Sequence, residues 1–289
     1  MSGIPGTLEH YVTLRDGVKM FCREYGDANR QGPAVLCLPG LTRNSRDFEP
    51  LARVLAGRWR VLTPDLRGRG RSDYDPNWRQ YQPMTYVADV GELLQQRGES
   101  RVVVIGTSLG GLIAMLMAAL NPKALAGAVL NDIGPEIDPA GVARIAGYVG
   151  KLPPVHTWED AAAQARLVNG AALPDYTEDD WMRFAHAAYR DDGHGRPVLD
   201  MDPRIGDAMR ESPAGAAPDL WPLFGALVPV PALAIRGALS DLLSPATFAR
   251  MAQVKPDLRT LLVPGRGHAP TLDEPVCREA IVAFLESIA

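Results

Sequence analysis

The sequence predicts an α/β fold in which a mainly parallel sheet carries helices on both faces. Short apolar runs that suit buried strands alternate with segments of helical spacing. This alternation stops after residue 133 and resumes near residue 230, and the intervening segment shows helical patterns only. The chain has 289 residues, 46% of them hydrophobic and 22% charged, which suits a globular protein with a sizeable core. We therefore expect a core domain of residues 1–133 and 220–289, interrupted by a helical cap of residues 134–219.

The first half of the chain supplies six expected strands. Residues 10–14 and 18–25 flank Asp16-Gly17, a dipeptide typical of a tight turn, and they predict a β-hairpin. Residues 34–38 form a continuous apolar run, as expected for a strand whose two faces are both covered. The other strands expected in this half are residues 60–64, 101–105 and 125–130.

The segments between and after these runs supply the helices and the remaining strands. Helical spacing covers residues 48–55 and 84–97, and an apolar helix follows residue 108. Beyond the insertion, the alternation predicts two more strands and two helices. They are strands 230–236 and 258–263 and helices 245–254 and 274–288.

Charge and cysteine content narrow the class of protein. The net charge of −4 gives no electrostatic attraction to nucleic acid or to an anionic membrane. Residues 1–10 show no secretory signal pattern, and the apolar segment 112–120 is far shorter than the roughly 20 residues that cross a bilayer. Cys22, Cys37 and Cys277 have no metal-type spacing and are expected to be reduced and buried. We expect a cytoplasmic protein without a nucleic-acid or membrane partner.

One serine lies in a pattern that suits a nucleophile. Gly106-Thr107-Ser108-Leu109-Gly110 stands between the apolar run 101–105 and the apolar helix. Glycines two residues before and after Ser108 remove the Cβ atoms that would collide in a tight strand-to-helix turn. Such a turn exposes the serine hydroxyl and leaves the next backbone N–H free to bind an oxyanion.

A serine hydroxyl needs a base, and His268 is the best placed of the five histidines. It follows the last predicted strand, and catalytic groups of open α/β sheets gather at the carboxyl ends of strands. The other histidines lie in the opening strand (His10) or in the insertion (His156, His186 and His194).

An acid should orient the histidine, and two aspartates follow strand ends. Asp241 comes five residues after the strand 230–236, and Asp132 comes after the strand 125–130. We favour Asp241 because the order Ser108, Asp241, His268 is the one expected for this fold class, with Asp132 as the alternative.

Two backbone N–H groups could stabilise an oxyanion. Leu109 supplies one because it follows Ser108, and Leu41 supplies the other from the loop Pro39-Gly40-Leu41-Thr42 after the strand 34–38. The sequence contains no His-Glu-x-x-His, phosphate-binding or dinucleotide-binding motif, so we expect no metal and no organic cofactor.

Four segments in this order resemble the α/β-hydrolase family over essentially the whole chain. They are the turn around Ser108, the segment Asp65 to Ser72 (Asp-x-Arg-Gly-x-Gly-x-Ser), Gly237-x-x-x-Asp241, and Gly267-His268 with Glu274-Pro275. The resemblance implies an eight-stranded, mostly parallel sheet with an inserted helical cap. It also implies a Ser–His–Asp mechanism with Ser108, His268 and Asp241 in these roles. The chain differs from many members in having Pro39-Gly40 where they have His-Gly.

The cap is expected to sort substrates by shape over Ser108. Five of its side chains are candidates for lining that pocket: Trp158, Trp181, Phe184, His186 and Tyr189.

Together these features predict a serine hydrolase that cleaves a small to medium, largely apolar carboxylic ester or lactone. Carbon–carbon bond hydrolysis of diketones and enol-lactone hydrolysis use the same triad in this family and stay open. A small-molecule receptor that has kept the hydrolase shell is a further alternative. The oligomeric state is not indicated.

Overall fold

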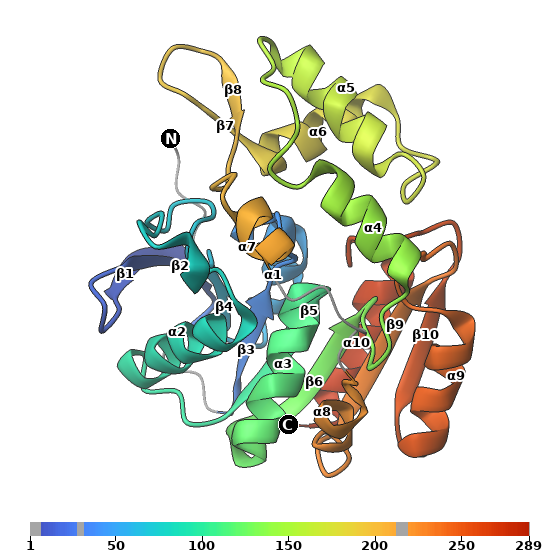
Figure 1. Cartoon of the computed structure of the whole chain (residues 1–289). Helices are drawn as coiled ribbons and strands as arrows, with labels where there is room; N and C mark the ends of the chain where they lie inside the picture. The colour runs from blue at the N-terminus through green and yellow to red at the C-terminus, as the bar shows by residue number, and fades with distance from the viewer. Residues whose placement is uncertain (1–6, 28–31, 212–218, 289) are drawn as a thin grey trace.

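The computed structural model describes residues 7–27, 32–211 and 219–288, and an eight-stranded sheet forms its centre (Figure 1). The strand order is β1-β2-β4-β3-β5-β6-β9-β10. Only the pairs β1–β2 and β2–β4 are antiparallel among these described strands. The strands are β1 (Thr7–Thr13), β2 (Lys19–Tyr25), β3 (Ala34–Leu38), β4 (Val61–Pro64), β5 (Val102–Thr107), β6 (Leu125–Asn131), β9 (Ala232–Gly237) and β10 (Arg259–Val263). The predicted α/β class with a mostly parallel sheet is confirmed.

Helices cover both faces of this sheet and give it two apolar layers. One layer joins α1 (Glu49–Leu55) and α10 (Pro275–Glu286) to the sheet. The other layer includes side chains of α2 (Pro83–Gln96), α3 (Leu109–Leu120), α8 (Trp221–Gly225) and α9 (Pro245–Val254). Because both faces are covered, β3, β4 and β6 are buried at every position, which explains why their sequences are mainly apolar.

The insertion between β6 and α8, called the cap below, is not wholly helical, and its elements α5, α6, β7 and β8 lie above the sheet in Figure 1. It contains α4 (Pro139–Tyr148), α5 (Trp158–Asn169), α6 (Glu178–Ala188) and α7 (Ile205–Glu211). It also contains an antiparallel pair, β7 (Tyr189–Asp191) and β8 (Pro197–Leu199). The prediction of helices alone is therefore wrong here. Strands of only three residues carry too little alternation to be seen in a sequence.

Short 3₁₀ helices complete the described chain at Ser45–Phe48, Trp78–Gln80 and Pro122–Ala124. The cap helices α5 and α6 begin with matching capping boxes. Thr157 and Asp160 exchange side-chain and backbone hydrogen bonds at the start of α5, and Thr177 and Asp180 do the same for α6. These bonds satisfy backbone N–H groups that a helix start otherwise leaves unpaired.

The cap has an apolar core of its own and is also tied to the sheet domain. Trp181 and Ala185 of α6 pack with Ala161 and Ala165 of α5 in that core. Polar ties then connect the cap to loops at the carboxyl edge of the sheet. Asn44 Nδ2 donates to the Ala187 carbonyl oxygen, Arg46 pairs with Asp200 at 2.5 Å, and the Gly267 N–H donates to the Ala172 carbonyl oxygen.

All three cysteines are free and buried, as expected. Burial raises the pKa of each thiol above its ordinary value, which disfavours the reactive thiolate. Within residues 7–27, 32–211 and 219–288, no helix is both long enough and apolar enough to cross a membrane.

Candidate active site

Ser108 stands on a strained turn between β5 and α3, as predicted. Its backbone has φ 51° and ψ −113°, a conformation that side chains rarely adopt. The two flanking glycines are required by space. A Cβ on Gly106 would lie 2.3 Å from the carbonyl carbon of Gly110, and a Cβ on Gly110 would lie 2.1 Å from the carbonyl oxygen of Leu38. The turn therefore depends on glycine at both positions.

Gly110→Ala should lower the free energy of unfolding by about 3 kcal/mol, because the added methyl group meets a strand carbonyl and not a movable side chain. Gly91→Ala is the matched control. Gly91 lies exposed within α2 with open space around its Cβ position, so alanine there should raise stability by about 0.5–1 kcal/mol. Denaturant unfolding of both variants measures the difference. Equal stabilities for Gly110→Ala and the parent chain would contradict this account of the turn.

His268 connects Ser108 to a carboxylate. Its Nε2 lies 2.9 Å from Ser108 Oγ, and its Nδ1 lies 2.8 Å from Asp132 Oδ2. A carboxylate accepts hydrogen bonds, so Nδ1 carries the N–H and donates a hydrogen bond to Asp132. Nε2 is then free to accept from the Ser108 hydroxyl. The imidazole side chain is 8% exposed and Asp132 is fully buried, so water does not compete for their contact.

Asp132 is held in place by the ends of two strands. It directly follows β6 and has φ 55°. Its Oδ1 accepts from the Gly237 N–H at 2.7 Å, and its Oδ2 accepts from the Ser240 hydroxyl at 2.5 Å. Strand pairing explains its nearness to the serine. Thr107 of β5 is in register with Asn131 of β6, so the next residues, Ser108 and Asp132, leave the sheet side by side.

The structure thus contradicts the expected position of Asp241 and favours the alternative, Asp132. Asp241 pairs with Arg144 of α4, whose Nε and Nη2 lie 2.5 and 2.9 Å from its two carboxylate oxygens. These hydrogen bonds with Arg144 hold the pKa of Asp241 below its ordinary value, although partial burial opposes this. The loop after β9 therefore presents Ser240 to Asp132 and turns Asp241 toward the cap.

Of the two predicted oxyanion donors, Leu109 directly follows Ser108 in the chain and Leu41 lines the same cleft as Ser108. Leu109 is the first residue of α3, so its N–H has no carbonyl four residues earlier within the helix. Leu41 lies in the loop after β3, and its carbonyl oxygen accepts from Arg69 Nε at 2.6 Å. Gly40 brings this loop close to the serine, since a Cβ on Gly40 would lie 3.8 Å from Ser108 Cβ. Whether both N–H groups bind an oxyanion remains a prediction.

Two arginines of the segment Asp65 to Ser72, Arg67 and Arg69, have structural contacts. Arg67 pairs with Asp75 and Asp89 at 2.5 Å, and Arg69 donates to the Leu41 and Arg67 carbonyl oxygens. The side chains of Arg67 and Arg69 are buried, so they do not form an exposed anion site.

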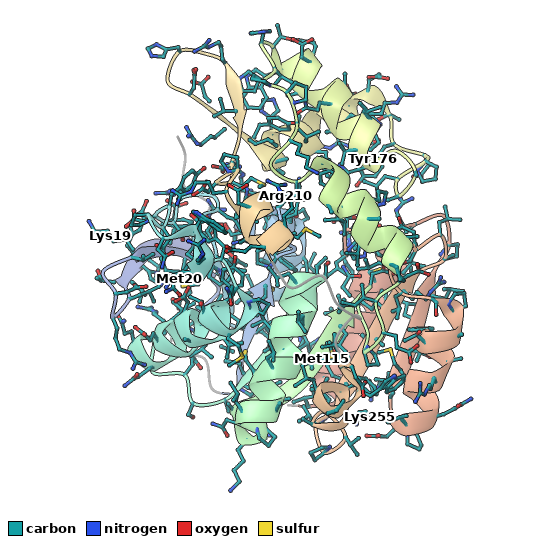
Figure 2. The ribbon with its side chains drawn as sticks, in the orientation of Figure 1. Lys19, Met20, Met115, Tyr176, Arg210 and Lys255 are labelled. Carbon is teal, nitrogen blue, oxygen red and sulfur yellow. The ribbon has the colours of Figure 1, made fainter. Side chains whose placement is uncertain are left out.

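Ser108 and His268 open into a cleft of about 300 Å³ between the sheet domain and the cap. Phe184 of α6 lines it, as predicted. Tyr176, labelled in Figure 2, also lines it from the loop between α5 and α6. Further apolar lining residues are Leu41, Ile145, Tyr148 and Leu173.

The other four predicted cap residues do not line this cleft. Trp158 stacks on His186, with ring centroids 4.1 Å apart, and His186 is exposed. Trp181 is 2% exposed in the core of the cap. Tyr189 is buried beside a smaller neighbouring pocket, where its hydroxyl donates to Gln164 and burial raises its pKa to about 12. The large apolar side chains of the cap mostly pack in its own core. The spacing of these residues in the sequence does not show whether they face that core or the cleft.

The sequence interpretation missed Arg43, which also lines the cleft. Its guanidinium binds both oxygens of Asp47, at 2.7 and 2.5 Å, and its Cζ lies 4.1 Å from the centroid of the Phe184 ring. Burial disfavours the charged guanidinium, but Asp47 outweighs this and the pKa of Arg43 lies above its ordinary value. Its place two residues after Leu41, directly after the expected oxyanion loop, was the available signal.

Among the described residues, no group of three or more His, Cys, Asp or Glu side chains is arranged to hold a metal ion. The expectation that no metal or cofactor is needed stays a prediction.

A sequence model of the alpha/beta hydrolase family matches residues 35–279. Together with the sheet order and the turn at Ser108, this match identifies the class of protein. The chain belongs to the alpha/beta hydrolase family, a family of hydrolases, as the resemblance predicted.

Individual relatives agree with this class. The chain is 35% identical to a 3-hydroxybutyrate-oligomer hydrolase of Cupriavidus necator over 89% of each protein. It is 28% identical to a 2-(acetamidomethylene)succinate hydrolase of Mesorhizobium japonicum, covering 96% of this chain and 97% of that one. A crystal structure of an alpha/beta hydrolase from Novosphingobium aromaticivorans superposes with a TM-score of 0.92 at 48% identity, covering 98% and 99% of the two chains.

Proposed function

We propose that this chain is a serine hydrolase that cleaves carboxylic esters through Ser108, His268 and Asp132. The observation that carries the proposal is the pair of hydrogen bonds through His268, which joins Ser108 in the lining of the cleft to the buried Asp132. A serine on a strained turn, a histidine that accepts its proton and an acid that orients the histidine are the parts of an acyl-transfer site.

In the proposed reaction, His268 Nε2 takes the hydroxyl proton while Ser108 Oγ attacks the ester carbonyl carbon. The N–H groups of Leu41 and Leu109 stabilise the oxyanion, and Asp132 stabilises the imidazolium. The intermediate collapses, the ester C–O bond breaks, and His268 returns the proton to the leaving alkoxide. Water then attacks the acyl-enzyme with His268 as base. This releases the carboxylic acid and restores the Ser108 hydroxyl.

The cleft and one relative support a small or medium ester as the substrate. The cleft volume of about 300 Å³ and its partly apolar walls suit such a molecule. The Cupriavidus necator relative is named for oligomers of 3-hydroxybutyrate, and oligomers of a hydroxy acid are joined by ester bonds. We propose that residues 134–219 act as the cap over this substrate and that the protein works in the cytoplasm without a metal, cofactor, nucleic-acid or membrane partner.

A substrate panel tests the proposed reaction. We expect fastest turnover on 3-hydroxybutyrate dimer and p-nitrophenyl butyrate, with lower rates on long-chain p-nitrophenyl esters, a lactone and a diketone. Dominant cleavage of the diketone would identify the alternative, carbon–carbon bond hydrolysis, and dominant cleavage of an enol-lactone would identify a lactonase. Tight reversible binding without turnover, and without covalent labelling of Ser108 by a fluorophosphonate, would instead indicate a receptor.

A further inference from the structure

We propose that Arg43 forms a carboxylate-binding subsite in the cleft, and that the preferred substrates are esters carrying a free carboxylate a few bonds from the reacting carbonyl. This inference rests on the proposed ester hydrolysis and adds the substrate class. It assigns a binding role to a side chain outside the Ser108, His268 and Asp132 group.

The position of Arg43 places it beside the nucleophile. Arg43 and Ser108 flank Gly40, because a Cβ on Gly40 would lie 3.8 Å from both Arg43 Cγ and Ser108 Cβ. Both side chains line the same cleft. A group bound by Arg43 would therefore belong to the same small molecule as the carbonyl over Ser108.

The guanidinium is held in one orientation before any substrate arrives. Nε and Nη2 of Arg43 donate hydrogen bonds to the Asp47 carboxylate, and the Phe184 ring of the cap packs against the guanidinium. Within the described residues, the recorded side-chain acceptors of Arg43 are the two Asp47 oxygens, which leaves the Nη1 edge for another acceptor. An arginine fixed in this way loses little conformational entropy on binding.

A carboxylate suits this group better than a neutral acceptor does. The guanidinium matches carboxylate geometry, and a charge-assisted hydrogen bond is about twice as strong as a neutral one. The side chain of Arg43 is only 17% exposed, so solvent weakens the interaction less than at the surface. The pairing with Asp47 reduces the net charge, and we therefore expect a moderate effect and not an absolute requirement.

The two other arginines that line the cleft are poorer candidates. Arg46 directs its guanidinium to Asp200 and to the carbonyl oxygens of Ala187 and Tyr189. Arg183 is 72% exposed and pairs with Asp180. Both side chains, at 29% and 72% exposed, are also more open to solvent than the side chain of Arg43 at 17%.

Two measurements test the subsite, and both compare Arg43→Gln with the parent chain. The first uses 3-hydroxybutyrate dimer and its C-terminal carboxamide, which differ only in the charge at one end. We expect Arg43→Gln to lower kcat/KM for the free acid about tenfold or more, mainly through KM, and the value for the carboxamide less than about threefold. Equal losses on both substrates, or no preference of the parent chain for the acid, would overturn the subsite while leaving ester hydrolysis intact.

The second measurement is calorimetric binding of 3-hydroxybutyrate itself, which needs no turnover. Arg43→Gln should weaken binding about tenfold or more, and Arg43→Lys should give an intermediate affinity because it keeps the charge and loses the planar fork. Arg166→Gln removes an exposed cap charge outside the cleft and should change nothing. Thermal unfolding identifies any variant that fails to fold. Unchanged 3-hydroxybutyrate binding in a folded Arg43→Gln variant would reject the subsite even if no ester were ever cleaved.

Discussion

Replacing Ser108 with alanine should lower ester hydrolysis by a factor of at least ~10³ and leave the fold intact. The hydroxyl that attacks the carbonyl is lost, whereas the His268–Asp132 pair and the two backbone N–H groups stay in place. Initial rates with p-nitrophenyl butyrate measure the loss. Stability should change by less than about 0.5 kcal/mol, because within the described residues the Ser108 hydroxyl is hydrogen-bonded to His268 Nε2 alone.

Covalent labelling distinguishes Ser108 as the nucleophile from a Ser108 that affects the rate only through its surroundings. A fluorophosphonate should modify the parent chain at a single serine and leave the Ser108→Ala variant unmodified. Retention of most of the activity in a folded Ser108→Ala variant would show that another residue is the nucleophile.

The sequence was sufficient for the architecture because the covered sheet leaves a strong pattern. A strand such as β3, buried at all five positions, must be apolar throughout. The helix expected at 245–254 has the observed bounds of α9, where Ser244 caps the first turn and Pro245 begins it. The turn at Ser108 was equally accessible, since only glycine fits where Gly106 and Gly110 pack against neighbouring backbone.

The choice of acid could not be settled by sequence order alone. Both Asp132 and Asp241 follow strands, and the order of motifs favoured Asp241. What separates them is tertiary structure. Arg144 comes from a cap helix 97 residues earlier in the chain and pairs with Asp241. The better signal was register, since Asp132 stands one residue past β6 just as Ser108 stands one residue past β5.

The cap residues were hard to predict for a different reason. An aromatic side chain in a helix can face the cap core, the cleft or solvent, and Trp181, Phe184 and His186 of α6 do these three things respectively. The described part of the cap consists of short helices and a short hairpin, and each helix meets other elements on more than one side. The periodicity of apolar residues within one helix therefore does not indicate which side faces the cleft.

The acid has the second largest expected effect, and a matched pair of substitutions measures it. Asp132→Asn should lower kcat by about 10²–10⁴, because an amide N–H in place of a carboxylate oxygen favours the imidazole tautomer that cannot accept the serine proton. The variant should still fold, since the amide oxygen can accept from Gly237 or Ser240, as the carboxylate does now.

Asp241→Asn is the control with the same chemical change at the other strand end, and it should retain at least about a third of the activity. Its partner Arg144 is 32% exposed and Asp241 is 38% exposed, so loss of this pair should cost at most about 1 kcal/mol of stability.

The Asp241 carboxyl also titrates below the neutral pH at which activity is measured, because its pKa is lowered. A carboxyl whose folded pKa is lowered contributes its stability above the unfolded pKa and loses it as the pH falls through the folded value. At neutral pH the ionised Asp241 carboxylate therefore makes its full contribution to the stability of the parent chain, and the activities of both variants are compared under that condition. A larger loss of activity in Asp241→Asn than in Asp132→Asn would mean that the working enzyme draws Asp241 onto His268 and that the pairing with Arg144 must open during turnover.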